Sequence, residues 1–312
     1  MGTGSGFGKT ILFGEHFVVY GLPALASALG SKTDARVEKI PEKGYKLNDN
    51  RPEVSGYKKK KFDEQTVSIG NVIKFMGLDL DKQGIEITLA GDLVCASGVG
   101  ASAASCVSLA RAINEEFALG WDDNKINEAA YEGEKGYHGT PSGLDNTAST
   151  FGGLVYFMKN LEGGPNTMET IKLSTPVELV IASSGMTANT KDVVADVRKM
   201  KDENPKWFEN IVIEYKKVIS DGRKALEDAD FQIVGDLMNK NHELLNKITV
   251  SNDVLDKMVK IARDAGALGS KVTGTGRGGN MISLTPGTEI QNKVAQALED
   301  AGHRVWKTII GV

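Results

Sequence analysis

The chain contains little cysteine and no long apolar segment. Its 312 residues include two cysteines, Cys95 and Cys106, a number that excludes a disulfide scaffold and is typical of a reducing compartment. No uninterrupted apolar run reaches the roughly 18 residues that a membrane span needs, and no charged-then-apolar leader opens the sequence. We therefore expect a cytoplasmic protein without a membrane partner.

Charge of one sign is not in excess either. The sequence has 37 Lys and Arg residues against 41 Asp and Glu residues, for a net charge of -4, so it lacks the basic footprint that nucleic-acid binding requires. The one basic block, residues 58–61, is followed at once by Asp63 and Glu64, which is typical of a solvated surface. We expect no nucleic-acid partner.

A glycine-rich loop without lysine occupies residues 98–104. Apolar and polar residues alternate over 85–89, which predicts a strand, and apolar residues recur at helical spacing over 107–117. A glycine loop ahead of a helix offers free N–H groups and partial positive charge, so it suits phosphate. The P-loop lysine is absent, however, and Glu115 comes too early for the acid of a dinucleotide site. Taken alone, the loop fits a simple helix-entry turn equally well.

The remaining periodicity predicts an α+β protein with a sheet-bearing first half and a more helical second half. The polar residues 42–64 predict a surface excursion, and 162–166 predict an exposed loop near a domain boundary. We expect two domains, residues 1–170 and 171–312. The expected strands are 8–21, 85–89, 152–158, 177–182, 280–284 and 304–310, and the expected helices are 63–76, 107–117, 123–137, 189–201, 206–227, 231–247, 253–264 and 289–300.

Three glycine-rich blocks, at residues 98–104, 139–146 and 274–279, call for a common explanation. A bulky anion at all three accounts for repeated close backbone approach better than three independent turns do. If the anion is a nucleoside triphosphate, its charge needs neutralising, and Mg²⁺ held by a hydroxyl and a carboxylate is the natural remedy. Ser102 is the hydroxyl on the loop, Glu134 is a carboxylate ahead of the second block, and Lys9 could add a full positive charge.

These blocks resemble the three motifs of the GHMP kinase superfamily, and in their detail those of its mevalonate kinases. The first similarity is Gly8-Lys9-Thr10-Ile11-Leu12-Phe13-Gly14-Glu15-His16-Phe17-Val18-Val19-Tyr20-Gly21. The second is Gly133-Glu134 followed by His138-Gly139-Thr140-Pro141-Ser142-Gly143-Leu144-Asp145-Asn146, and the third is Lys271-Val272-Thr273-Gly274-Thr275-Gly276-Arg277-Gly278-Gly279. The motifs span nearly the full chain in the family's order. The resemblance implies a two-domain fold, with an N-terminal domain of the ribosomal protein S5 domain 2-like type and a C-terminal ferredoxin-like α/β domain.

The resemblance also implies residue roles. Asp145 is the catalytic carboxylate near the substrate hydroxyl, Lys9 its cationic neighbour, and Ser102 and Glu134 the Mg²⁺ ligands. Two mechanisms stay open: either Asp145 removes the proton of the substrate hydroxyl outright, or Lys9 chiefly stabilises negative charge during the transfer. The implied ATP-binding residues are Gly98, Gly100, Ala101, Ser102, Ala103, Gly274 and Gly276, and the implied substrate-binding residues are Glu15, His16, Val19, Ser142, Thr273 and Gly274. For His16, a satisfied core histidine is the rival interpretation.

The activity that follows from the resemblance is ATP- and Mg²⁺-dependent phosphorylation of the 5-hydroxyl of (R)-mevalonate. Alternatives are another kinase of the superfamily acting on phosphomevalonate, galactose or homoserine, and a nucleotide-binding regulator without turnover. A homodimer stays open. The chain departs from the family at Ala101 and Cys95, where a second serine and a proline are usual, and at Arg277 and Asn280, which replace small or apolar residues.

Overall fold

A computed structural model of the chain describes residues 1–96, 98–186 and 188–312. Internal contacts divide it into two units: the first unit holds residues 1–9 and 28–152, and the second holds 10–27 and 153–312. Strands β1 (Gly2–Phe13) and β2 (Ala24–Ile40) therefore contribute residues to both. These units group residues by packing and do not test the division at residue 170, which stays a prediction.

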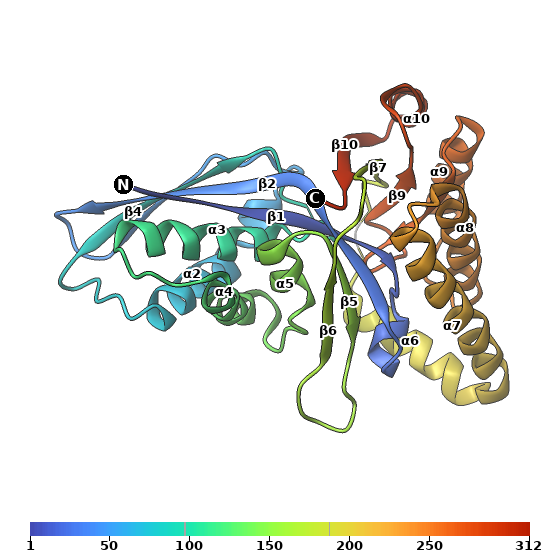
Figure 1. Ribbon diagram of the computed structural model, residues 1–312, viewed down its shortest axis with the longest axis horizontal. Helices are drawn as coiled ribbons and strands as arrows, with labels where there is room; N and C mark the ends of the chain where they lie inside the picture. The colour runs from blue at the N-terminus through green and yellow to red at the C-terminus, as the bar shows by residue number, and fades with distance from the viewer. Residues whose placement is uncertain (97, 187) are drawn as a thin grey trace. The chain divides into compact units, whose positions relative to one another are not determined.

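The first unit is a sheet covered by helices (Figure 1). Its β2 segment pairs antiparallel with β4, and β4 pairs in parallel with β3. Apolar residues that alternate along these strands, such as Val37 and Ile87, are fully buried together with Val107 and Ile113 of α3. Its other elements are β3 (Tyr45–Asp49), α1 (Tyr57–Lys60), α2 (Phe62–Phe75), β4 (Gly84–Gly91), α3 (Ala101–Glu116), α4 (Asp123–His138) and α5 (Leu144–Phe151).

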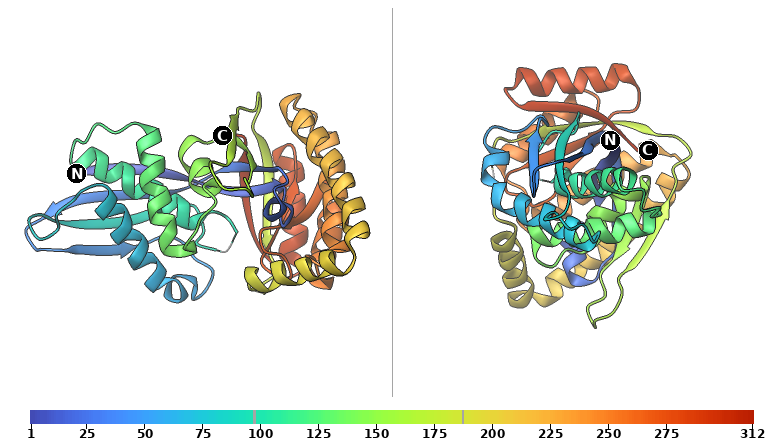
Figure 2. Two further views of the ribbon diagram at one scale, coloured as in Figure 1. Left: turned by 90° about the horizontal axis from the view of Figure 1, so that it is seen from below. Right: turned by 90° about the vertical axis from the view of Figure 1, so that its left-hand side faces the viewer.

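Alternate glycines of β1 bring helix α3 against the strand backbone. A Cβ atom at Gly6 would overlap the carbonyl oxygen of Ala104, and one at Gly4 would overlap that of Ser108. Because residues 104 and 108 lie one helical turn apart, the period of two along the strand matches the rise of the helix. Figures 1 and 2 show α3 running beside β1. The close approach fixes where the helix begins, immediately after the glycine loop.

The second unit contains an antiparallel sheet in the order β10-β7-β9-β8 and the helices of the second half of the chain. Helices α8 and α9 pack on β8, α10 packs on β10, and α7 lies beside α8 (Figure 2). The elements are β5 (Leu154–Met158), β6 (Thr167–Ile171), β7 (Val177–Ser183), α6 (Thr190–Glu203), α7 (Pro205–Glu227), α8 (Phe231–Lys247), α9 (Asp253–Asp264), β8 (Gly269–Thr273), β9 (Asn280–Leu284), α10 (Thr288–Asp300) and β10 (Arg304–Ile310).

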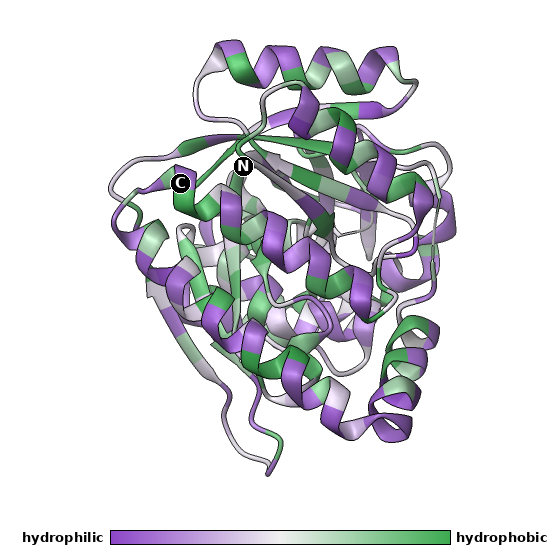
Figure 3. Cartoon of the chain, turned by 90° about the vertical axis from the view of Figure 1, so that its right-hand side faces the viewer, coloured by the Kyte–Doolittle hydropathy of each residue, from purple (hydrophilic) through white to green (hydrophobic). Residues whose placement is uncertain are grey.

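Local signals account for the helices that the sequence predicted well. The Asp230 side chain accepts a hydrogen bond from the backbone of Ile233 and begins α8, and Asn252 accepts one from Leu255 and begins α9. Both helices are amphipathic, with apolar and polar residues alternating along them at helical spacing (Figure 3). The predicted bounds of α8, α9, β9 and β10 are confirmed. Among the described residues, no helix is long and apolar enough to cross a membrane.

Several elements have no counterpart among the predictions. The stretch 42–64, predicted as a surface excursion, contains strand β3 and helix α1, and its Arg51 is buried. The predicted strand over 8–21 ends at Phe13 and gives way to a turn and a short 3-10 helix, Phe17–Tyr20. Strands β2, β6 and β8 and helix α5 also lack predictions. All five residues of β8 are buried although it contains Ser270 and Lys271, so no alternation marks it.

Candidate active site

The glycine loop of the first unit ends at the first residue of α3. Gly98 has φ +88° and Gly100 has φ +71°, in the left-handed region that favours glycine, and Gly100 is the residue before the helix. A Cβ atom at Gly100 would lie 2.7 Å from Cγ of Lys9. Lys9 of β1 thus packs directly against the loop, where it also donates its backbone N–H to the carbonyl of Val99 at 2.9 Å.

Lys9 forms an ion pair with Asp145 in the first unit. The Lys9 Nζ lies 3.2 Å from Oδ1 of Asp145, and the two side chains are 7% and 29% exposed. Asp145 is in the first turn of α5, where the free N–H groups of the helix favour a carboxylate. The pair therefore presents a partly exposed carboxylate beside a buried ammonium, next to the glycine loop.

Glu134 of α4 is buried beside the same loop, where Ser102 lies near enough to its carboxylate to favour the charged form. Burial raises the pKa of Glu134 to about 8, and the charge of Asp145 adds to that rise, while Ser102 and Lys9 oppose it. Its Oε1 has no hydrogen-bond partner among the described residues. No cluster of three or more His, Cys, Asp or Glu residues with metal-binding geometry occurs in the described part of the chain. A hydroxyl and a buried carboxylate with a spare oxygen nevertheless fit Mg²⁺, which takes oxygen ligands and keeps several waters.

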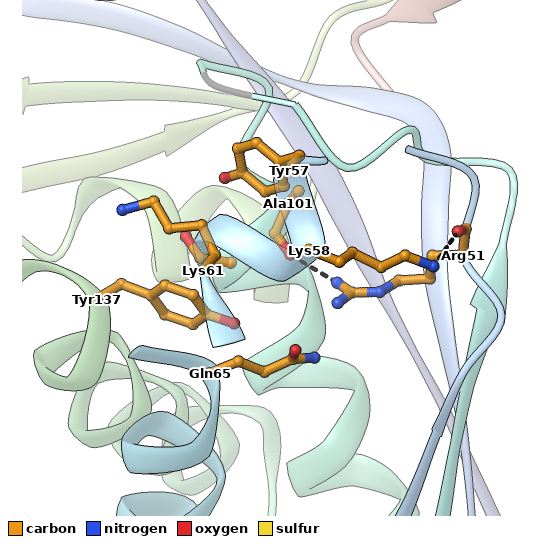
Figure 4. Close-up of a pocket in the computed structure, with 8 residues that line it drawn as sticks. Arg51, Tyr57, Lys58, Lys61, Gln65, Ala101 and Tyr137 are labelled. Atoms are coloured by element: carbon orange, nitrogen blue, oxygen red, sulfur yellow. Dashed lines mark hydrogen bonds between the residues drawn. The ribbon is translucent and has the colours of Figure 1, made fainter. Parts of the chain in front are cut away.

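A buried cation that the sequence analysis missed supports the loop from the first unit. Arg51 donates from Nε and Nη2 to the Asp49 carboxylate, at 2.9 and 2.6 Å. Figure 4 shows its third bond, from Nη1 to the carbonyl of Ala101 at 3.3 Å. Lys58 donates to the carbonyls of Asp49 and Arg51, both at 2.9 Å. Arg51 lies in the polar stretch interpreted as surface, and nothing local distinguishes it from an exposed charge. These groups line a small pocket with Tyr57, Lys61, Gln65, Ser102 and Tyr137.

A second set of predicted residues lies in the second unit, where the turn after β1 meets the end of β8. His16 has φ 61°, outside the usual range for a non-glycine residue, and its Nε2 lies 2.7 Å from the carbonyl oxygen of Thr275. Glu15 pairs with Lys271, and both side chains are fully buried. The hydroxyls of Thr10 and Thr273 are 3.2 Å apart. The structure therefore unites the first and third motifs within this unit.

The ring of His16 is poised as a hydrogen-bond acceptor. Burial lowers the pKa of His16, the hydrogen bond to Thr275 opposes that effect, and the charge of Arg277 reinforces it. A neutral ring that donates from Nε2 to the carbonyl oxygen leaves Nδ1 as an acceptor. Nδ1 is buried and has no hydrogen-bond partner among the residues that the structure describes. The core-histidine interpretation leaves this atom without an explanation.

The remaining predicted residues occupy plain structural positions. Ser142 accepts a hydrogen bond from the backbone of Leu144 at 3.2 Å, at the start of α5. Val19 lies half-buried in the short 3-10 helix of the second unit. Ala103 is fully buried in α3, and Gly274 and Gly276 both have positive φ. The structure brings Lys9, Ser102, Glu134 and Asp145 together in the first unit, and Glu15, His16, Thr273 and Gly274 together in the second.

Comparison with known proteins identifies the family. The family model for the GHMP kinases N-terminal domain matches residues 68–153, and the GHMP kinases C-terminal model matches 223–304. The mevalonate kinase of Thermococcus gammatolerans is 33% identical over 94% of this chain and 91% of that protein, and that of Pyrococcus furiosus is 31% identical over the same shares. The crystal structure of L. major mevalonate kinase in complex with R-mevalonate is 38% identical and covers 99% of this chain and 96% of that one, with a TM-score of 0.96.

These likenesses confirm the predicted two-domain GHMP kinase fold of mixed α and β content. They also identify an ATP-dependent kinase of small molecules. Both family models and the relatives together cover nearly the whole sequence. The chain belongs to the mevalonate kinase family of the GHMP kinases.

Proposed function

We propose that this protein transfers the γ-phosphoryl group of ATP to the primary 5-hydroxyl of (R)-mevalonate, giving 5-phosphomevalonate and ADP. The observation that carries the proposal is the pair of Lys9 and Asp145, 3.2 Å apart, beside the glycine loop that precedes α3. The choice of mevalonate is supported by the relatives, one of which was solved with R-mevalonate bound.

The pair suits attack by an alcohol. The hydroxyl oxygen of the substrate forms a bond to the γ-phosphorus while the bond to the β,γ-bridging oxygen breaks, and that electron pair leaves with ADP. The hydroxyl proton passes to the carboxylate of Asp145. The ammonium of Lys9 offsets negative charge that spreads over the phosphoryl oxygens.

The start of α3 is the proposed binding site for the phosphates. Free N–H groups of the first turn and the positive end of the helix dipole favour an anion there, and Gly98 and Gly100 leave room for it. Ser102 and Glu134 would hold Mg²⁺, which supplies neutralising charge for the triphosphate when bound. The Ser102→Ala variant should need about tenfold more Mg²⁺ for half-maximal rate, since one ligand is lost. An unchanged Mg²⁺ dependence would remove Ser102 from the metal site.

Residues of the second unit are the proposed mevalonate ligands. The Nδ1 atom of His16 is an acceptor that a substrate hydroxyl can fill, and Thr273 offers a hydroxyl at the end of β8. Glu15, Val19 and Gly274 keep the binding roles that the family resemblance implies, as does Ser142 of the first unit. His16→Gln, which removes the ring Nδ1 but keeps a side-chain N–H donor, should raise the KM for mevalonate and leave that for ATP unchanged.

A coupled ADP-release assay tests the activity. Mevalonate, phosphomevalonate, galactose and homoserine are offered separately, and nuclear magnetic resonance of the product locates the new phosphate. Turnover of mevalonate at the 5-position supports the proposal, whereas a clear preference for a sugar or an amino-acid alcohol overturns it. Nucleotide binding without turnover of any of the four would favour a regulator.

Variants of the carboxylate test the mechanism. Asp145→Asn should lower kcat by about a thousandfold, because the group that accepts the proton is lost while the loop that binds nucleotide is untouched. The matched control is Asp81→Asn, an exposed aspartate of the same unit, which should keep the parent rate. Near-parent turnover by Asp145→Asn would shift the role to Lys9, and Lys9→Met then becomes the decisive variant.

Two further proposals concern the cellular location of the protein and its oligomeric state. We propose that the protein works in the cytoplasm, since both of its cysteines are buried and unpaired by disulfide. Cell fractionation tests this placement. The homodimer stays a prediction, and analytical ultracentrifugation at two protein concentrations decides it.

A further inference from the structure

Arg277, one of the departures from the family pattern, is held in an uncommon backbone conformation in the second unit. Its φ is 51°, in the region that glycine tolerates and other residues rarely enter. Its Nε donates to the carbonyl of Thr249 and its Nη2 to the hydroxyl of the same residue, both at 2.7 Å. Its Nη1 pairs with Asp196 of α6, so all three nitrogens of the guanidinium are engaged.

The neighbouring backbone is equally constrained. Thr249, which accepts both of those bonds, has φ 60°. The backbone N–H of Arg277 donates to the carbonyl of Val250 at 2.7 Å, and a Cβ atom at Gly276 would overlap that same carbonyl oxygen. Backbone strain of this kind persists only where the surroundings over-determine it, and it gathers at functional sites. A glycine would enter this conformation freely, so the arginine is explained by its side chain.

The constrained loop also carries the partner of His16. Thr275 lies two residues before Arg277, and its carbonyl oxygen is 2.7 Å from Nε2 of His16. Its hydroxyl lies 2.7 Å from that of Thr190, the first residue of α6. Helix α6 therefore anchors the loop at two points: Thr190 holds Thr275, and Asp196 holds Arg277. The carbonyl of Thr275 that contacts His16 lies between these two anchored side chains along the loop.

Arg277 acts on His16 through charge as well as through the backbone. Its guanidinium contributes to lowering the pKa of His16, although burial has the larger effect and the hydrogen bond to Thr275 opposes both. A neutral ring whose Nε2 proton is committed to Thr275 must offer Nδ1 as an acceptor. The nearby charge of Arg277 favours the neutral ring, and the carbonyl that Arg277 holds in place favours the tautomer with its proton on Nε2.

We propose that Arg277 is a positioning residue for mevalonate: by tying the third-motif loop to α6, it fixes the Thr275 carbonyl and thereby the orientation of the His16 ring. The inference deepens the proposed function and rests on it for the identity of the ligand. Arg277 itself need not contact substrate. Its loss should therefore weaken substrate binding without affecting the Lys9 and Asp145 pair.

Steady-state kinetics of four variants test the kinetic part. Arg277→Ala and Arg277→Gly should raise the KM for mevalonate about tenfold, with the KM for ATP within about twofold of the parent, because a misplaced ring loses orientation. Arg277→Lys keeps the positive charge but not the planar guanidinium, so its KM for mevalonate should lie between that of these two variants and that of the parent. The matched control is Arg198→Ala, which removes an exposed arginine from the same helix α6 and should change neither KM.

The glycine variant separates positioning from stability. Arg277→Gly relieves the strain at φ 51° and should unfold at a higher temperature than Arg277→Ala, yet both should bind mevalonate equally poorly. A KM for mevalonate that changes less than twofold in both variants overturns the proposal. Changes in KM that simply follow the unfolding temperature overturn it as well.

A spectroscopic measurement keeps the test independent of the substrate. Nitrogen-15 spectra of histidine-labelled protein at pH 8 report which ring nitrogen carries the proton, and the His16→Gln variant assigns the signal among the four histidines. The parent should show His16 as a single Nε2-protonated form, and Arg277→Gly should show a mixture of tautomers. An unchanged His16 signal overturns the positioning role. If the parent does not phosphorylate mevalonate, the proposed function fails, while the spectra still decide whether Arg277 orients His16.

Discussion

His242 of α8 should make the second unit less stable in mild acid. The side chain is 5% exposed, its Nε2 lies 3.1 Å from Oδ1 of Asp256, and its Nδ1 accepts the backbone N–H of Val272 at 3.5 Å. The pKa of His242 is lowered to about 4, chiefly by burial; the charge of Asp256 opposes the shift, and the charges of Arg263 and Lys271 contribute to it. Burial wins, so the ring is neutral in the folded protein at pH 7.

The size of the effect follows from linkage. The unfolded chain binds a proton at His242 with a pKa near 6.5, and the folded protein binds it near 4. Between those values the unfolded state holds more protons, so stability is full above pH 6.5 and falls as pH drops toward 4. At about 1.36 kcal/mol per pH unit, the total loss is about 3 kcal/mol, of which about 1.4 kcal/mol is already lost at pH 5.5.

Urea unfolding at several pH values between 7.5 and 4.5 measures this loss. Carboxylates titrate in the same range, so the quantity of interest is the difference in unfolding free energy between the parent and His242→Asn at each pH. The unfolding free energy of the parent minus that of the variant should fall by about 2.5 kcal/mol from pH 7.5 to 4.5, because the variant has no ring to protonate. The histidine control, His303→Asn, should track the parent. A difference that stays constant across the range would refute the reasoning.

Three further predictions concern packing and buried charge. Gly6→Ala should lower the free energy of unfolding by about 3 kcal/mol, because the new methyl group overlaps the backbone of α3. The control Gly70→Ala, in open space on α2, should raise it by up to about 1 kcal/mol. Equal effects of the two variants in thermal or urea unfolding would contradict the close approach of α3 to β1. Lys271→Met should lower the free energy of unfolding by about 3 to 5 kcal/mol, because it leaves the Glu15 carboxylate buried without its cation. Adding Glu15→Gln should restore part of that loss. If the effects of the two substitutions simply add, Lys271 and Glu15 are not energetically coupled. Cys106, whose pKa is raised by burial, should resist a thiol reagent at pH 8 until urea unfolds the chain, and labelling of the folded protein would disprove its burial.

The residues of the first-unit site could be predicted because each sits in a short motif with its own chemical signature. The glycine loop indicated phosphate, and its missing lysine raised the question of where the cation comes from. In the first unit Lys9 packs on Gly100 and pairs with Asp145, so a cation lies beside the loop. Arg51 could not be predicted in the same way, because a buried arginine and an exposed one look alike in sequence until their partners are known.

Strand β8 shows the same limit at the level of the fold. Its lysine and serine disguise a wholly buried strand, because the polar groups are satisfied by residues distant in sequence: Lys271 by Glu15, and the Ser270 hydroxyl by that of Ser283. Sequence patterns assign a polar residue to the surface because water would satisfy its hydrogen bonds there. In the folded protein, other residues can satisfy those bonds in place of water. Helices α8 and α9, by contrast, carry caps and apolar spacing within their own segments.

By itself, the sequence determined the family motifs, the amphipathic helices and the residue types available for phosphoryl transfer, because each of these is encoded in a short stretch. Only the tertiary structure decided which charges are paired and which atoms stay open. It placed Lys9 beside Asp145, brought Ser102 near Glu134, and engaged Nε2 of His16 while leaving Nδ1 without a partner among the described residues. The physical reason is that burial and pairing depend on contacts between segments far apart in the chain, and these arise only when the backbone has folded.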